Sequence, residues 1–155
     1  MNRRNACIAI ALMTSAASLF GAENTRFGNW KVNLDKSTYN PGPKPTVAST
    51  LRIEAMGKGE KVSVKGIADG KPTEYSYTAT SDGKPYATSG SPYGDHATLK
   101  IIDERASEMT YTANGKVTRT ARRTVSADGK TLTIASNGVN AKGEQYNNTV
   151  VYERQ

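Results

Sequence analysis

From residue 29 onward, apolar and polar residues alternate in short runs, which is the period of strands with one buried face. The first run places Trp30, Val32 and Leu34 on one side, with Lys31 and Asn33 between them. No segment keeps a helical period over three turns. The alternation predicts about ten strands, near residues 29–34, 47–56, 61–68, 73–81, 84–89, 96–103, 107–113, 116–126, 130–140 and 144–153.

Glycine-containing turns separate the runs, and several have the form Asp-Gly-Lys or Asn-Gly-Lys, as at Asp82-Gly83-Lys84 and Asn114-Gly115-Lys116. Asp-Gly and Asn-Gly accept the positive φ angles that tight hairpins need. Successive hairpins give an antiparallel meander, and closing the meander removes its two exposed edges. We therefore predict an all-β fold, an antiparallel meander closed into a barrel of about eight to ten strands.

The N-terminus has the layout of a secretory signal peptide. Two arginines at the start precede an apolar run that begins at Ala6, and small residues follow at Gly21 and Ala22. This run is too short to span a membrane. Cleavage is expected after Ala22 or Gly21, with Ala17 as the alternative.

The leader sets the expected domain organisation and location. Residues 1–22 are predicted to be a signal peptide and residues 23–155 a single β-barrel domain in the periplasm or outside the cell. The single cysteine, Cys7, lies in the leader, so the mature domain has neither disulfides nor thiolate metal ligands. His96 has no second histidine with which to bind a metal. The sequence supports no catalytic triad, so we expect no enzymatic activity, no cofactor and no metal site.

The net charge and the composition bear on whether the chain binds nucleic acid and on how polar the barrel interior is. The formal net charge is +7, and the lysines and arginines are spread through turns and strands instead of forming one stripe. This distribution favours a solvated surface over a nucleic-acid footprint. Broadly counted hydrophobic residues make up 36% of the chain, and valines outnumber leucines. A barrel with a partly polar interior fits this composition better than a thick dry core.

One strand carries charge on its apolar side. Alternation places Val117, Arg119, Ala121, Arg123 and Val125 on the same side. If that side faces inward, two guanidinium groups point into the barrel, where each can hold a carboxylate or phosphate. Two structural alternatives are a β-bulge that turns one arginine outward, and an arginine stacked on an aromatic ring at the end of the barrel.

Tyrosines are the second group of candidate residues. Tyr75, Tyr77 and Tyr111 lie on the apolar faces of their strands, where they either line a ligand cavity or fill the core. Other tyrosines lie in or near loops, where they are expected to form a mobile mouth or a rim for a partner: Tyr39, Tyr86 and Tyr93.

The segment Phe27-Gly28-Asn29-Trp30-Lys31-Val32 resembles the opening of the calycin barrels, the lipocalins and fatty-acid-binding proteins, whose first strand begins with Gly-x-Trp. The chain end, Thr149-Val150-Val151-Tyr152-Glu153-Arg154, is similar to the last strand of the fatty-acid-binding branch. The chain also resembles small lipocalin-like domains exported by bacteria. The resemblance implies that Trp30, with Gly28 beside it, plugs one end under a late cationic side chain. Arg122 is assigned to this plug, and Arg154 competes for the same role.

Two departures limit what the resemblance implies. Fatty-acid-binding proteins clamp a carboxylate with an arginine two positions before the last-strand tyrosine, whereas here Val150 precedes Tyr152 at that spacing. They also insert a helix–turn–helix lid where this chain has a proline-rich arm at residues 41–45. The barrel and an inward Tyr152 are therefore implied, and the clamp is not.

The expected function is binding or carrying a small apolar or amphipathic ligand such as a lipid, outside the cytoplasm. Either Arg119 or Arg123 would meet an acidic head group. The candidate ligand-binding residues are Tyr75, Tyr77, Tyr111, Arg119, Arg123 and Tyr152. The alternative is a secreted protein-interaction module or inhibitor that acts through the loops at residues 36–46 and 86–95. Neither a nucleic-acid partner nor a membrane-spanning segment is expected.

Overall fold

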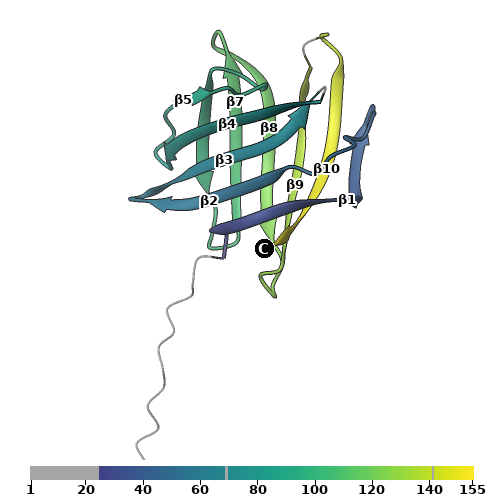
Figure 1. Cartoon of the computed structure of the whole chain (residues 1–155). Coiled ribbons are helices and arrows are strands. Elements are labelled where there is room, and N and C mark those ends of the chain that lie inside the picture. Colours follow the sequence, from purple (N-terminus) through teal and green to yellow (C-terminus); the bar gives the residue numbers. More distant parts are fainter. Residues whose placement is uncertain (1–24, 69, 141) are drawn as a thin grey trace, which may run out of the picture.

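The computed structural model describes residues 25–155 except residues 69 and 141, and this part of the chain forms ten strands (Figure 1). The predicted signal peptide lies outside the described residues. Among the described residues there is no helix, and so none that is long and apolar enough to cross a membrane. The strands are β1 Gly28–Asn40, β2 Thr50–Met56, β3 Gly59–Ala68, β4 Lys71–Thr80, β5 Tyr86–Ser89, β6 His96–Ile101, β7 Ala106–Ala113, β8 Lys116–Val125, β9 Thr131–Val139 and β10 Gln145–Arg154.

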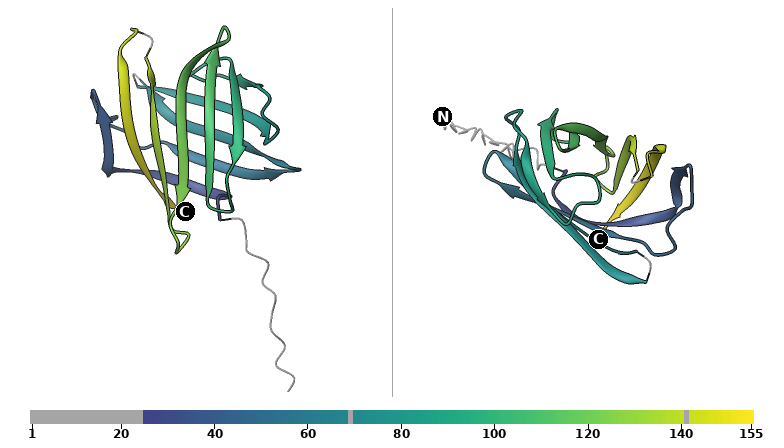
Figure 2. Two further views of the ribbon diagram at one scale, coloured as in Figure 1. Left: turned by 180° about the vertical axis from the view of Figure 1, so that it is seen from behind. Right: turned by 90° about the horizontal axis from the view of Figure 1, so that it is seen from above.

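The strands form one closed antiparallel barrel, as the sequence predicts. Each strand pairs with its neighbours in the chain, and β1 pairs with both β2 and β10, which closes the sheet. Seen from above, the strands curve around a common axis (Figure 2). Closure gives every strand two partners, so the barrel has no exposed sheet edge.

Alternation along the strands builds the core. The inward faces bury aliphatic and aromatic side chains from all parts of the barrel, among them Leu51, Ile53, Leu99, Met109 and Leu132. The outward faces are polar. Trp30 near the start of β1 is fully buried, and the arm at residues 41–49 connects β1 to β2.

The first strand is longer than predicted. Its polar second half stays in the sheet because the β1–β10 register shifts between Asn33 and Thr38. Ser37 joins the two strands at this shift: its buried hydroxyl donates to the Asn33 carbonyl oxygen at 2.7 Å and accepts from the Val151 amide at 2.9 Å. The predicted loop at residues 36–46 is therefore wrong in its first part, since residues 36–40 belong to β1. The connection is the arm at residues 41–49.

Candidate functional site

Trp30 closes one end of the barrel. Its side chain is fully buried, and the guanidinium of Arg154, its partner across the β1–β10 pair, lies 4.1 Å from the ring centroid. Arg154 is held in place because it donates hydrogen bonds of 2.6–2.9 Å to three backbone carbonyls, those of Thr25, Phe27 and Gly129. The N-terminal segment, the last strand and the β8–β9 turn are thus tied together over the indole.

Gly28 lies beside this plug as predicted, and Arg122 does not. Gly28 has a φ of +139°, and a Cβ atom at this position would collide with the Arg154 guanidinium, so glycine is required. The assignment of Arg122 to the plug is wrong: its side chain is 53% exposed and forms an ion pair of 2.7 Å with Glu108 on the outer face. Neighbouring strand residues point to opposite faces, so Arg122 lies outside where Arg123 lies inside.

Arg123 points inward but is already paired. Its Nη2 atom bonds to Oε1 of Glu60, and its Nε atom donates to the Ser107 hydroxyl at 3.0 Å. The other carboxylate oxygen of Glu60 is 3.2 Å from Nη1 of Arg26. Glu60 is fully buried, and the two arginines are 2% and 4% exposed. Burial lowers the pKa of Arg26 and the Glu60 carboxylate opposes that shift, so the group remains a cation.

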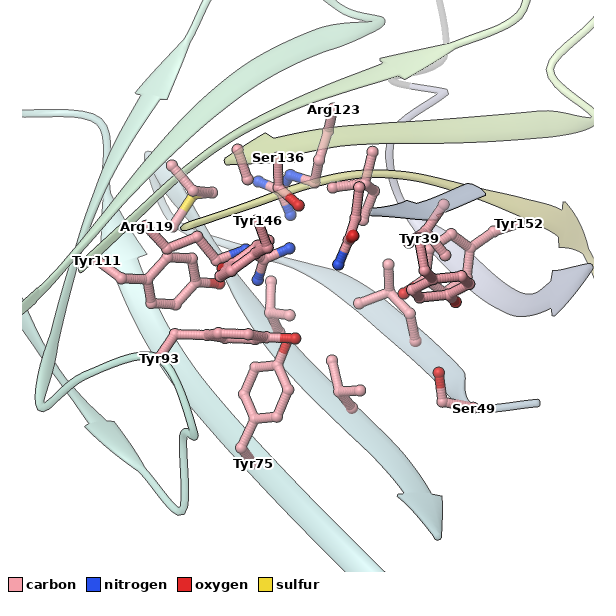
Figure 3. Close-up of a pocket in the computed structure, with 18 of the residues that line it drawn as sticks. Tyr39, Ser49, Tyr75, Tyr93, Tyr111, Arg119, Arg123, Ser136, Tyr146 and Tyr152 are labelled. Carbon is pink, nitrogen blue, oxygen red and sulfur yellow. The ribbon is translucent and has the colours of Figure 1, made fainter. Parts of the chain in front are cut away.

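A cavity of about 360 Å³ opens above this buried cluster, toward the arm. All six predicted ligand-binding residues line it: Tyr75, Tyr77, Tyr111, Arg119, Arg123 and Tyr152. Figure 3 labels all of them except Tyr77. The prediction that these side chains face inward is therefore confirmed, while their role in binding stays a prediction. The prolines at positions 41 and 45 add the arm to the wall.

Arg119 is a charged residue in the wall of this cavity that has no acidic partner among the described residues. Its side chain is 8% exposed to solvent, and its guanidinium carbon lies 3.9 Å from the Tyr93 ring centroid and 5.3 Å from that of Tyr111. Its Nε atom has no hydrogen-bond partner, and no carboxylate of the described residues forms an ion pair with it. Aromatic faces support a cation but do not neutralise it. Arg119 is thus a buried positive charge that faces a cavity.

A bulge in β8 turns Val117 outward, while regular alternation after the bulge keeps Arg119 and Arg123 on the inward face. The β7–β8 register shifts after Tyr111, so that Thr112 faces Val117 while Tyr111 faces Arg119. The extra residue, Thr118, donates from its hydroxyl to the Tyr111 carbonyl at 3.1 Å and also bonds to a loop carbonyl. The bulge precedes Arg119, so it is Val117 that turns outward, with 61% exposure. The expectation that Val117 shares the inward face is wrong for this reason.

The cavity tyrosines remain protonated. Burial is the main cause that raises the pKa of Tyr75, Tyr77, Tyr111 and Tyr152 above the usual phenol value. A neutral phenol both donates and accepts a hydrogen bond. The wall around Arg119 therefore combines ring faces with hydroxyl donors.

Sequence reasoning missed several residues of the site. Tyr93, from the loop at residues 90–95, turns inward beneath Arg119, and Tyr39 also lines the cavity, so neither is a rim residue. Tyr86 lies elsewhere and donates to Asp82 at 2.8 Å. Glu60, which is fully buried and pairs with the cavity residue Arg123, had no predicted role. The predicted loop at residues 86–95 is also wrong in its first part, because residues 86–89 form β5.

The remaining polar candidates lie outside the cavity. His96 is exposed and its Nδ1 atom is 2.9 Å from Asp95, a surface pair of neighbours in the chain. Across the part of the chain that the structure describes, no group of three or more histidine, cysteine or acidic residues is arranged to hold a metal ion. The cavity offers the guanidinium of Arg119, phenol and serine hydroxyls, asparagine amides and apolar side chains.

Comparison with known proteins gives a fold but no sequence family. No family model matches this chain, and no curated protein matches it significantly. The crystal structure of the zebrafish ileal bile acid-binding protein in complex with cholic acid is similar, with a TM-score of 0.51 and 8% sequence identity. The match covers 84% of this chain and 99% of that one. At this identity the likeness shows the fold alone. The chain thus has a calycin-like fold, the closed ten-stranded antiparallel barrel found among fatty-acid and bile-acid-binding proteins.

Proposed function

We propose that this barrel binds a small amphipathic molecule with an anionic group, and that Arg119 holds that group inside the cavity. The observation that carries the proposal is the position of Arg119, a nearly buried cation that faces a cavity without an acidic partner among the described residues. A buried charge is costly unless it is paired. An anionic ligand supplies the missing partner.

The balance of buried charge supports the same conclusion. Among the described residues, the buried charged groups are three arginines and one glutamate: Arg26, Arg119, Arg123 and Glu60. Glu60 is shared by Arg26 and Arg123, and it forms no ion pair with Arg119. A carboxylate, sulfonate or phosphate that enters the cavity therefore gains charge-assisted hydrogen bonds with Arg119.

The rest of the wall suits the apolar part of such a ligand. Between the polar groups the cavity is lined by aliphatic side chains, including Leu51, Val62, Met109, Ile134 and Val150. The similar zebrafish structure holds cholic acid, and this supports an amphipathic acid here by analogy of fold. The position of the cation differs from the clamp of fatty-acid-binding proteins, since Arg119 lies on β8 and Val150 occupies the position on β10.

The alternative of a protein-interaction module receives less support. The segments assigned to it place side chains in the cavity wall: Pro41 and Pro45 from the arm, and Tyr93 from the loop at residues 90–95. Residues turned inward in this way serve a small ligand better than a protein surface. We further propose that the role is binding without catalysis and that, given the signal peptide predicted at residues 1–22, it takes place outside the cytoplasm.

A matched pair of fluorescent probes tests the proposal. 8-Anilino-1-naphthalenesulfonate and N-phenyl-1-naphthylamine share one skeleton, and the first alone carries a sulfonate. We expect the sulfonate to bind at micromolar concentration and at least about tenfold more tightly than the neutral amine, the worth of a charge-assisted hydrogen bond. Arg119→Ala should abolish this difference, which fluorescence titration measures directly.

The control is Arg122→Ala, which removes an arginine from the same strand but from the outer face. This variant should leave both affinities unchanged. Equal affinity of the two probes in the unmodified protein would contradict the proposal. So would loss of the sulfonate preference in Arg122→Ala.

A further inference from the structure

Tyrosine dominates the cavity wall to an unusual degree. The chain has eight tyrosines, and seven of them line the cavity, Tyr86 being the exception. Their rings pack against one another: the Tyr75 and Tyr93 ring centroids lie 5.8 Å apart at 90°, and those of Tyr93 and Tyr111 lie 5.4 Å apart at 59°. Edge-to-face and tilted ring pairs at these distances are favourable contacts, so the rings form one continuous part of the wall.

Two of these hydroxyls are open to a ligand. The hydroxyl groups of Tyr75 and Tyr93 form no hydrogen bond with any residue of the described chain, and both side chains line the cavity (Figure 3). By contrast, the hydroxyl of Tyr86 outside the cavity is bonded to Asp82. The wall near Arg119 thus offers donors and acceptors that no protein group takes up.

Tyr146 adds to the same region. It pairs with Gly138 across β9 and β10, and its hydroxyl oxygen is 2.9 Å from the point where a Cβ of residue 138 would lie. The glycine thus leaves room for the phenol to lie flat against β9. The Tyr146 hydroxyl is buried without a partner, and its ring contributes to the cavity wall with Arg119.

We infer that the ligand is an acid built on a rigid ring system that carries further oxygen atoms, in preference to an alkyl-chain acid. This inference rests on the proposed function, because it assigns the acidic group to Arg119. Ring faces of the ligand would pack on the tyrosine rings, and its additional oxygens would meet the hydroxyls of Tyr75 and Tyr93.

The reason an alkyl chain fits poorly is the cost of unpaired hydroxyls. A methylene chain that fills the cavity displaces water from the phenols and offers them no hydrogen bond. Sites built to bond a ligand hydroxyl discriminate strongly against an analogue that lacks it, since their own polar groups are then left unpaired. Tyr75 and Tyr93 are therefore specificity-determining residues in this inference.

Three acids test the inference by isothermal titration calorimetry on the full barrel: 6-hydroxy-2-naphthoate, 2-naphthoate and decanoate. We expect affinity to fall in that order. The hydroxylated naphthoate should bind about three- to tenfold more tightly than 2-naphthoate, which is the effect of one neutral hydrogen bond. Tyr75→Phe or Tyr93→Phe should reduce the advantage of the hydroxylated ring to less than about twofold. Each change removes one oxygen and keeps the ring.

The matched control is Tyr86→Phe, which removes a phenol oxygen outside the cavity and should leave all three affinities unchanged. If decanoate binds as tightly as 6-hydroxy-2-naphthoate and loses affinity in Arg119→Ala, the proposed function stands and this inference is overturned. If the hydroxyl advantage survives in both phenylalanine variants, the assignment to Tyr75 and Tyr93 is overturned. If no acid shows dependence on Arg119, the proposed function fails as well.

Discussion

Glu60→Gln is expected to lower the free energy of unfolding by about 3–5 kcal/mol, the usual cost of removing one partner from a buried ion pair. Glu60 is fully buried and its two carboxylate oxygens serve Arg26 and Arg123 separately. Glutamine retains the shape but removes the negative charge that both arginines contact. Urea denaturation followed by circular dichroism measures the effect.

Glu54→Gln is the control for this change, because Glu54 forms an exposed ion pair of 2.8 Å with Arg52. Exposed pairs contribute little, so its effect should stay below about 1 kcal/mol. If Glu60→Gln fails to fold, replacing all of Arg26, Glu60 and Arg123 by methionine should restore folding, since all three charges of this cluster are then removed together. Equal stability of Glu54→Gln and Glu60→Gln would show that the cluster is not buried as described.

Trp30→Ala is expected to lower the free energy of unfolding by about 3–5 kcal/mol, the usual effect of removing a large buried aromatic side chain. The indole is fully buried and packs under the Arg154 guanidinium, which is itself bonded to three backbone carbonyls. Removing the ring leaves a void at the closed end and takes away the surface on which Arg154 rests. Thermal and urea unfolding curves report the loss.

Trp30→Phe should recover part of the stability, because it restores a ring of smaller area beneath Arg154. Val117→Ala is the control, a truncation of an apolar residue that is 61% exposed, and should change stability by less than about 0.5 kcal/mol. A cost for Trp30→Ala no larger than that of Val117→Ala would mean that Trp30 is not the plug.

The strand pattern was predictable because each strand alternates cleanly and most turns contain a glycine. The hairpin between β8 and β9, for example, has Gly129 at a φ of +70°, as the Asp-Gly signal requires. The end of β1 was not predictable in this way. Residues 35–40 are polar, and the register shift at Asn33 interrupts the alternation, so the pattern there does not resemble a half-buried strand.

The charged residues show where the sequence contained more information than the prediction used. Alternation along β8 already places Arg122 opposite Arg123, and alternation along β10 places Arg154 on the face of Tyr152. Glu60 likewise falls on the side of Val62, although no role was predicted for it. In each case the alternation of side chains along the strand determines whether the charged residue points into the barrel or out of it.

Other parts of the site depend on tertiary structure. Tyr93 lies in a loop without periodicity, and it reaches the cavity because Thr118, the extra residue of the β8 bulge, bonds to its carbonyl oxygen. Local sequence pattern also cannot predict that Arg123 has an ion-pair partner while Arg119 has none among the described residues. This difference arises from Glu60, which is 63 residues from Arg123 in the chain and forms an ion pair with Arg123 but not with Arg119.

A crystal structure of the barrel with 6-hydroxy-2-naphthoate bound would show directly whether Arg119 binds the acidic group of a ligand. We expect the carboxylate to lie in the cavity within about 3 Å of the guanidinium nitrogens of Arg119, with the ring against the tyrosine wall. An acid bound on the outer surface, or one inside the cavity whose carboxylate points away from Arg119 into solvent, would contradict it.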